Sequence, residues 1–206
     1  MVEVYKKWIM QVEELNDNDK EKMIDLENFL KEHTTELYKL VHAINKNENT
    51  RIEQLGYWED GEDKYFKFDG KTVGFSGDNT NEFLGKIIAL TQNYLPMGSI
   101  VELVNDTSSI PIKFMIINRL VSLENNSLFF DYAGIMYPVG IQEKGMSFNF
   151  TNGKISRIIV RGYEDIQEKM YISLMLDELL LTKGKLPYGV GTKEERTKFE
   201  EVIRGE

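Results

Sequence analysis

The sequence contains no cysteine and only two histidines among its 206 residues. The absence of thiols excludes disulfides, thiolate metal sites and cysteine nucleophiles. His33 and His42 lie nine residues apart, which is ~13.5 Å along a helix and too far to share a metal ion. The acidic run Glu59 to Asp63 lacks the spacing of a calcium loop, and no glycine-rich phosphate loop is present. We therefore expect no metal, no cofactor and no enzymatic activity.

Basic residues and long apolar runs are also scarce. The chain carries 25 Lys and Arg against 34 Asp and Glu, a net charge of −9, so phosphates would be repelled and a nucleic-acid partner is not expected. No run approaches the ~20 apolar residues that cross a bilayer, and the N-terminal stretch lacks the pattern of a signal peptide. We expect a cytoplasmic protein without membrane insertion, whose acidic surface suits solubility or a basic protein partner.

Two N-terminal helices are predicted, over Val4 to Leu15 and from an N-cap at Asp19 to about Asn45. The second has apolar residues at heptad spacing. His33 takes one of the inward positions, where a polar residue sets the register of helix packing more often than it binds a ligand. This stripe needs a partner, which is either another part of the chain or another molecule, including a second copy in a homodimer. The candidate partner-binding residues on this helix are Leu30, His33, Leu37, Leu40 and Ile44.

A β-hairpin and a connecting helix are expected next. Asp69-Gly70 between the alternating segments 64–68 and 72–75 is a strong hairpin signal. A helix capped by Asp78 or Thr80 then runs to about Tyr94, and Pro96 prevents its continuation.

The region 95–163 has the hydrophobic pattern of an antiparallel sheet. Asn152-Gly153 predicts a hairpin between the last two strands. Its aromatic residues either pack in the core or form an exposed protein-binding patch. The expected strands are 99–104, 112–123, 127–132, 146–150 and 155–160.

The last long helix is predicted over Tyr163 to Thr182, with Glu164-Asp165 at its start because negative charge favours a helix N-terminus. We expect it to pack deeply against the sheet and to bury Ile166, Met170, Leu174, Leu176, Leu179 and Leu180.

The predicted fold class is α+β, with a small antiparallel, partly barrel-like sheet of about five strands, flanking helices and an N-terminal helical hairpin. The expected divisions are a helical hairpin (1–50), a β-hairpin with a connecting helix (51–94), the central sheet (95–163) and a C-terminal helix with a polar tail (164–206). We expect residues 51 to about 185 to form one compact unit.

Four segments carry a resemblance to a known family: LPMGSIVELV (95–104), KFMIINRL (113–120), FDYAGIMYPVGI (130–141) and IVRGYED (159–165). They are similar to a family catalogued as a domain of unknown function, encoded beside type VII secretion loci and LXG-type toxin genes of Gram-positive bacteria. The family pattern has a glycine where this sequence has Asn118-Arg119. The residues that carry the family pattern are Leu95, Pro96, Gly98, Ser99, Asp131, Tyr132, Gly134, Tyr137, Pro138, Gly140, Gly162 and Tyr163.

The resemblance implies a non-enzymatic accessory protein, an adaptor or targeting chaperone that binds a secreted LXG-type toxin or its small helical partners. The alternative is an immunity protein that neutralises a neighbouring toxin through its acidic surface. A small hydrolase would need an acid/base pair that the sequence does not display. An adaptor should bind the helical N-terminal half of the toxin, whereas an immunity protein should bind the toxic C-terminal half.

Overall fold

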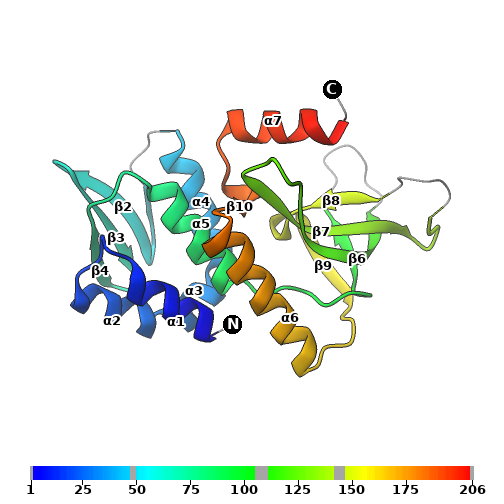
Figure 1. Cartoon of the computed structure of the whole chain (residues 1–206), viewed down its shortest axis with the longest axis horizontal. Coiled ribbons are helices and arrows are strands. Elements are labelled where there is room, and N and C mark those ends of the chain that lie inside the picture. The colour runs from blue at the N-terminus through cyan, green and yellow to red at the C-terminus, as the bar shows by residue number, and fades with distance from the viewer. Residues whose placement is uncertain (1, 47–49, 105–110, 142–146, 205–206) are drawn as a thin grey trace. The chain divides into compact units, whose positions relative to one another are not determined.

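The computed structural model describes residues 2–46, 50–104, 111–141 and 147–204 (Figure 1). It divides into two compact units. Unit 1 comprises Met1–Asn93 with Leu180–Thr182, and unit 2 comprises Tyr94–Leu179 with Lys183–Glu206. The segment from 51 to about 185, expected to form one compact unit, is thus divided after Asn93. The α+β class with an N-terminal helical region is confirmed, and the sheets in the described residues do not close into a barrel.

The N-terminal segment of unit 1 forms four helices: α1 (Val2–Gln11), α2 (Asp17–Asp25), α3 (Glu27–Glu32) and α4 (Thr34–Ile44). The prediction of one continuous helix from Asp19 to Asn45 is wrong, because breaks occur at Leu26 and His33. At His33 the backbone leaves the helical region, with φ −113° and ψ 27°. The N-cap is Asn16 and not Asp19, since the Asn16 side chain accepts a hydrogen bond from the Asp19 amide at 2.9 Å.

An antiparallel meander follows, formed by β1 (Thr50–Ile52), β2 (Leu55–Asp60), β3 (Asp63–Phe68) and β4 (Lys71–Phe75). The predicted hairpin at Asp69-Gly70 is confirmed, and both residues have positive φ, as a type I′ turn requires. Helix α5 (Thr80–Thr91) packs against α4, α3 and α1. Phe66, Phe75 and Phe83 form an aromatic core between this helix and the sheet.

Unit 2 is built on a six-stranded sheet in the order β10-β7-β6-β5-β9, with β8 also paired to β7. The strands are β5 (Ile100–Leu103), β6 (Ile112–Ser122), β7 (Leu128–Tyr137), β8 (Phe148–Phe150), β9 (Ile155–Val160) and β10 (Leu186–Pro187). The predicted β8–β9 hairpin is wrong: Asn152–Lys154 forms the 3-10 turn η1, β8 pairs with β7, and β9 pairs with β5.

The C-terminal segment contains α6 (Ile166–Leu176), the π-helical turn η2 (Asp177–Thr182), the 3-10 turn η3 (Tyr188–Val190) and α7 (Lys193–Arg204). Beyond η2 it completes one edge of the sheet, because β10 pairs in parallel with the start of β7. Phe199 of α7 is buried with Leu128 and Phe130 of β7. The Tyr188 hydroxyl donates to Glu200, and burial with this carboxylate raises the pKa of Tyr188 to about 12. Strand β7 is therefore covered by residues far along the chain.

Candidate functional site

The segments around Gly98 and Gly162 are joined closely in unit 2. The Ser99 hydroxyl donates to the Pro96 carbonyl at 2.7 Å and accepts from the Gly162 amide at 2.9 Å. A Cβ atom on Gly162 would lie 2.2 Å from the carbonyl oxygen of Met97, so only glycine fits there. Gly98 has φ +79°, which glycine adopts most readily. These family-pattern residues hold the start of β5 against the end of β9.

Asp131 and Tyr132 of β7 form a second internal junction. Both are fully buried, and the Asp131 carboxylate accepts from the Asn152 amide at 2.8 Å. The Tyr132 hydroxyl accepts from the Leu95 amide at 2.9 Å and donates to the Asn152 side chain at 3.3 Å. Burial, with a smaller contribution from Asp131, raises the pKa of Tyr132 above its ordinary value. The phenol therefore stays protonated and links three segments of the unit.

The remaining family-pattern residues lie along and after β7 and after β9. Gly134 leaves room for Phe150, whose ring would be 3.0 Å from a Cβ atom at this position. Tyr137 and Pro138 are exposed and joined by a cis peptide bond, and Gly140 donates to the Met136 carbonyl at 2.8 Å in a turn with φ +76°. Tyr163 has an exposed fraction of 82%, so packing does not explain it. Most of the family pattern builds the scaffold, and Tyr163 lies on the surface.

Arg119, which was not among the predicted site residues, is buried in β6. Ile116 pairs with Gly134 and Asn118 with Ala133, so Ile117 is the extra residue of a β-bulge. Arg119 is then buried beside Leu120, and Asn118 is exposed. The Arg119 guanidinium lies 2.8 Å from the Glu168 carboxylate and 5.8 Å from the Tyr171 ring centre, and both of these residues are on α6. In the sequence, a charged side chain inside the largely apolar segment 114–121 indicates such a buried residue.

Replacing Arg119 with methionine is expected to destabilise unit 2 by about 2 kcal/mol. The Arg119 side chain is 3% exposed, and its loss leaves the Glu168 carboxylate, which is 20% exposed, without its partner. Hydrogen exchange of the β6 and β7 amides would measure the change. Arg161→Met is the matched control, because Arg161 pairs with Glu164 at the surface and should contribute less than about 0.5 kcal/mol. Equal effects of the two substitutions would mean that the buried pair of Arg119 with Glu168 contributes no more than a surface pair.

The predicted partner-binding residues do not form an accessible surface. Leu30, Leu37 and Leu40 are completely buried inside unit 1. His33 is half-buried, with its ring stacked on Phe29 at 4.1 Å and its Nδ1 atom 2.8 Å from the Phe29 carbonyl oxygen. Ile44 is also half-buried. This correction follows from the breaks at Leu26 and His33, which fold the segment onto α5 and the sheet of its own unit.

The exposed apolar residues of unit 2 concentrate between the start of β9 and the end of α6. We call this region the β9–α6 surface; β9 is yellow and α6 orange in Figure 1. The largest exposed fractions are 82% for Tyr163, 70% for Ile166 and 68% for Leu174. The prediction that Ile166, Met170 and Leu174 are buried is wrong, although Leu176, Leu179 and Leu180 are buried as expected. The β9–α6 surface comprises Ile158, Ile159, Val160, Tyr163, Ile166, Met170, Tyr171 and Leu174.

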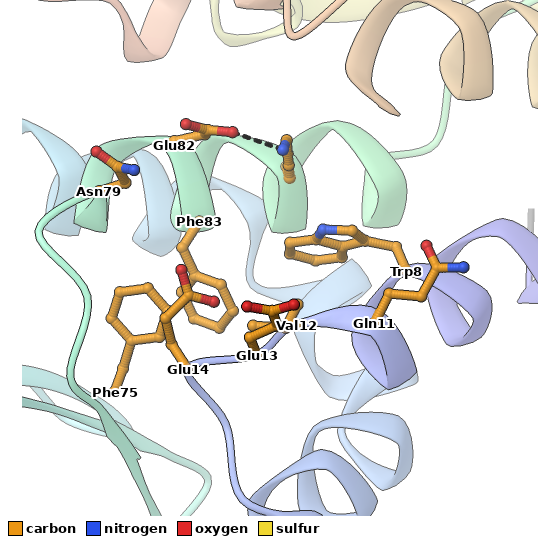
Figure 2. A pocket seen from close by; sticks show the side chains of 10 residues that line it. Trp8, Gln11, Val12, Glu13, Glu14, Phe75, Asn79, Glu82 and Phe83 are labelled. Atoms are coloured by element: carbon orange, nitrogen blue, oxygen red, sulfur yellow. Dashed lines mark hydrogen bonds and ion pairs between the residues drawn. The ribbon is translucent and has the colours of Figure 1, made fainter. Parts of the chain in front are cut away.

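A separate cleft of 280 Å³ lies within unit 1 (Figure 2). Its walls include the rings of Trp8, Phe75 and Phe83, and Phe75 stacks on Phe83 at 4.4 Å. The carboxylates of Glu13 and Glu14 also line the cleft, as Figure 2 shows. The three rings are buried, and Lys86, which also lines the cleft, pairs with Glu82 at 2.6 Å. The exposed carboxylates of Glu13 and Glu14 are the groups here that suit a cationic group of a partner.

The described part of the chain holds no group of three or more His, Asp or Glu residues arranged to bind a metal ion. Over the same residues, no helix is both long enough and apolar enough to cross a bilayer. Among the aromatic residues in or beside the sheet, Phe129, Phe130, Tyr132 and Phe150 are buried, and Tyr137, Phe148 and Tyr163 are exposed. This division does not follow simple alternation, because the consecutive residues Phe129 and Phe130 are both buried in a strand that is covered on both faces.

Residues 94–171 match a family described as Domain of unknown function (DUF4176), over less than half of the chain. The match contains all the family-pattern residues named above and ends within α6. The resemblance to an uncharacterised family is therefore confirmed for this region. No curated protein and no solved structure matches the chain.

Proposed function

We propose that this chain is a non-enzymatic accessory protein, an adaptor or targeting chaperone for a type VII-secreted LXG-type toxin. It would act in the cytoplasm by binding the toxin or the small helical partners of the toxin. The secretion context comes from the motif resemblance over residues 95–165, and the match of residues 94–171 to an uncharacterised family leaves that context open.

The observation that carries the binding role is the β9–α6 surface. Eight large apolar side chains are exposed between residues 158 and 174. Exposed apolar side chains in such number mark a site of protein interaction more often than isolated ones do. Tyr163, Tyr171 and Met170 are side chains of the kind that anchor protein interfaces. The internal junctions at Ser99–Gly162 and Tyr132–Asn152 hold the scaffold below this surface.

An immunity protein is the second candidate, and the cleft of unit 1 favours it. The exposed carboxylates of Glu13 and Glu14 at this cleft could receive a lysine or arginine of a basic toxic domain. The net charge of −9 would also speed association with such a partner. The two functions predict different partners and different surfaces, so one experiment separates them.

That experiment is a pull-down with the neighbouring LXG-type toxin, supplied as its helical N-terminal half and its toxic C-terminal half. We expect the N-terminal half to bind and the C-terminal half not to bind, with light scattering giving the stoichiometry of the complex. Retention of the C-terminal half alone would replace the adaptor by an immunity protein. In that case Glu13→Gln/Glu14→Gln should weaken binding, with Glu194→Gln/Glu195→Gln on α7 as the matched charge control. If neither half is retained, both functions are wrong.

A further inference from the structure

Helix α6 is apolar on two opposite faces. Ile172 and Leu176 are buried on one face. On the other face, Ile166, Met170 and Leu174 have exposed fractions of 70%, 58% and 68%. Their spacing of four residues aligns them along one ridge of the helix, which we call the α6 stripe. A single exposed apolar side chain is ordinary, but three along one ridge, with the exposed Tyr171 on the same helix, are not.

The stripe is presented on a helix that is already fixed in place. The Asp165 side chain caps α6 by accepting from the Glu168 amide at 2.9 Å. Glu168 and Tyr171 both contact the buried Arg119 of the sheet, at 2.8 Å and 5.8 Å. A partner would therefore meet a formed helix, and binding would not have to order it.

The shape of the stripe fits another helix better than an extended strand. Residues four apart form the ridges that pack into the grooves of a facing helix. The alternative, addition of a strand to the free edge of β9, is opposed by two irregularities in the pairing of β9 with β5 and by the exposed Arg157. Bulges and charged side chains are features that protect an edge strand from pairing.

Charge decides which helix the stripe can accept. The stripe itself is uncharged. Residues 161–183 carry five acidic and three basic side chains, a net charge of −2. Glu164 lies 3.3 Å from Arg161 and 4.0 Å from Lys169, and Glu178 lies 3.2 Å from Lys183, so part of this acidic charge is already paired. Packing of two copies on this face would bring two negatively charged segments together between chains of net charge −9. The same charge opposes an anionic membrane surface.

We infer that the α6 stripe is the docking site for an amphipathic helix of a partner protein that carries basic residues beside its apolar face. This assignment rests on the proposed adaptor function and names the surface and the partner chemistry that the function would use. Such a helix buries Ile166, Met170 and Leu174 under its apolar side chains and places its basic residues near the acidic side chains of this segment.

Affinity measurements on the full chain with the purified N-terminal half of the toxin test the surface. We expect Met170→Glu/Leu174→Glu to weaken binding at least about 30-fold, because the centre of the interface acquires buried charge. Val202→Glu on α7, another exposed apolar position of unit 2, should leave the affinity unchanged. Met170→Lys should weaken binding more than Met170→Glu, since a basic partner repels lysine. Circular dichroism checks that each variant is folded.

Cross-linking tests the helical nature of the partner, and it is simple because the chain has no cysteine of its own. A photoreactive label on Met170→Cys should react with partner positions three or four residues apart. Positions two residues apart would indicate a strand and overturn the assignment. The same label on Val202→Cys is the control and should give no cross-link.

The outcomes separate the assignment from the proposed function. If the wild-type chain binds the N-terminal half and the stripe variants bind equally well, the adaptor function stands and the α6 stripe is not its docking site. If light scattering shows a dimer of this chain that the stripe variants abolish, the occupant is a second copy. If the N-terminal half is not bound by the wild-type chain, the adaptor function fails and this assignment fails with it.

Discussion

Gly162→Ala is expected to destabilise unit 2 by about 3 kcal/mol, a large effect for the addition of one methyl group. The new Cβ atom would lie 2.2 Å from the Met97 carbonyl oxygen and 3.0 Å from the Ser99 amide nitrogen. Both are backbone atoms, which cannot rotate away as a side chain can. The substitution must therefore separate the start of β5 from the end of β9, and the bond between the Gly162 amide and the Ser99 hydroxyl should be lost with it.

Hydrogen exchange of the β5 and β9 amides is the measurement, because both tryptophans lie in unit 1 and their fluorescence does not report on unit 2. Gly153→Ala is the matched control: no atom lies within 4 Å of the place that its new Cβ atom would take, and its backbone does not have positive φ. The control should change stability by less than about 0.5 kcal/mol. Protection of β5 and β9 that survives Gly162→Ala would contradict the close approach at this position.

Leu37→Ala is expected to destabilise unit 1 by about 3 kcal/mol, because the Leu37 side chain is completely buried and its truncation leaves a cavity. If Leu37 instead lay in a partner-binding surface, the substitution would alter binding and leave the free energy of unfolding almost unchanged. Urea unfolding followed by the fluorescence of Trp8 and Trp58 measures the stability of the unit that contains Leu37.

Leu174→Ala provides the comparison for Leu37→Ala. The sequence patterns made Leu37 a candidate for partner binding, with packing inside the chain as the alternative, and assigned Leu174 to the core, whereas their exposed fractions are 0% and 68%. Leu174→Ala should change stability by less than about 0.5 kcal/mol and should weaken partner binding. A stability loss from Leu174→Ala equal to that from Leu37→Ala would mean that the α6 stripe is part of the core.

These two leucines show what hydrophobic periodicity can and cannot predict. The pattern indicates that one face of a helix is apolar, but not whether that face meets the same chain or another molecule. The segment 19–45 has an apolar seam that its own unit covers, after breaks at Leu26 and His33 that the heptad pattern did not reveal. In α6 apolar residues occupy both faces: Ile172 and Leu176 are buried, whereas Ile166, Met170 and Leu174 are exposed.

Strand assignment was more reliable where pairing is local. The Asp69-Gly70 hairpin follows directly from residues that tolerate positive φ. Asn152-Gly153 carries the same signal, yet β8 and β9 pair with β7 and β5, because partners distant in sequence supply the hydrogen bonds. The bulge at Ile117, which buries Arg119, depends likewise on pairing with β7. The sequence likewise does not reveal that Gly162, just after the end of β9, is required for a tertiary contact with Met97.

The coverage of β7 by the C-terminal segment bears on how this protein can be divided for expression. The family match ends at residue 171, whereas β10 and α7, which pair with and bury the start of β7, begin at residues 186 and 193. A fragment trimmed to the matched region would lose Phe199 and expose Leu128 and Phe130 beside an unpaired strand edge, a combination that favours aggregation. The boundary of sequence similarity is therefore not the boundary of the folding unit, and an isolated domain should run from Tyr94 through α7.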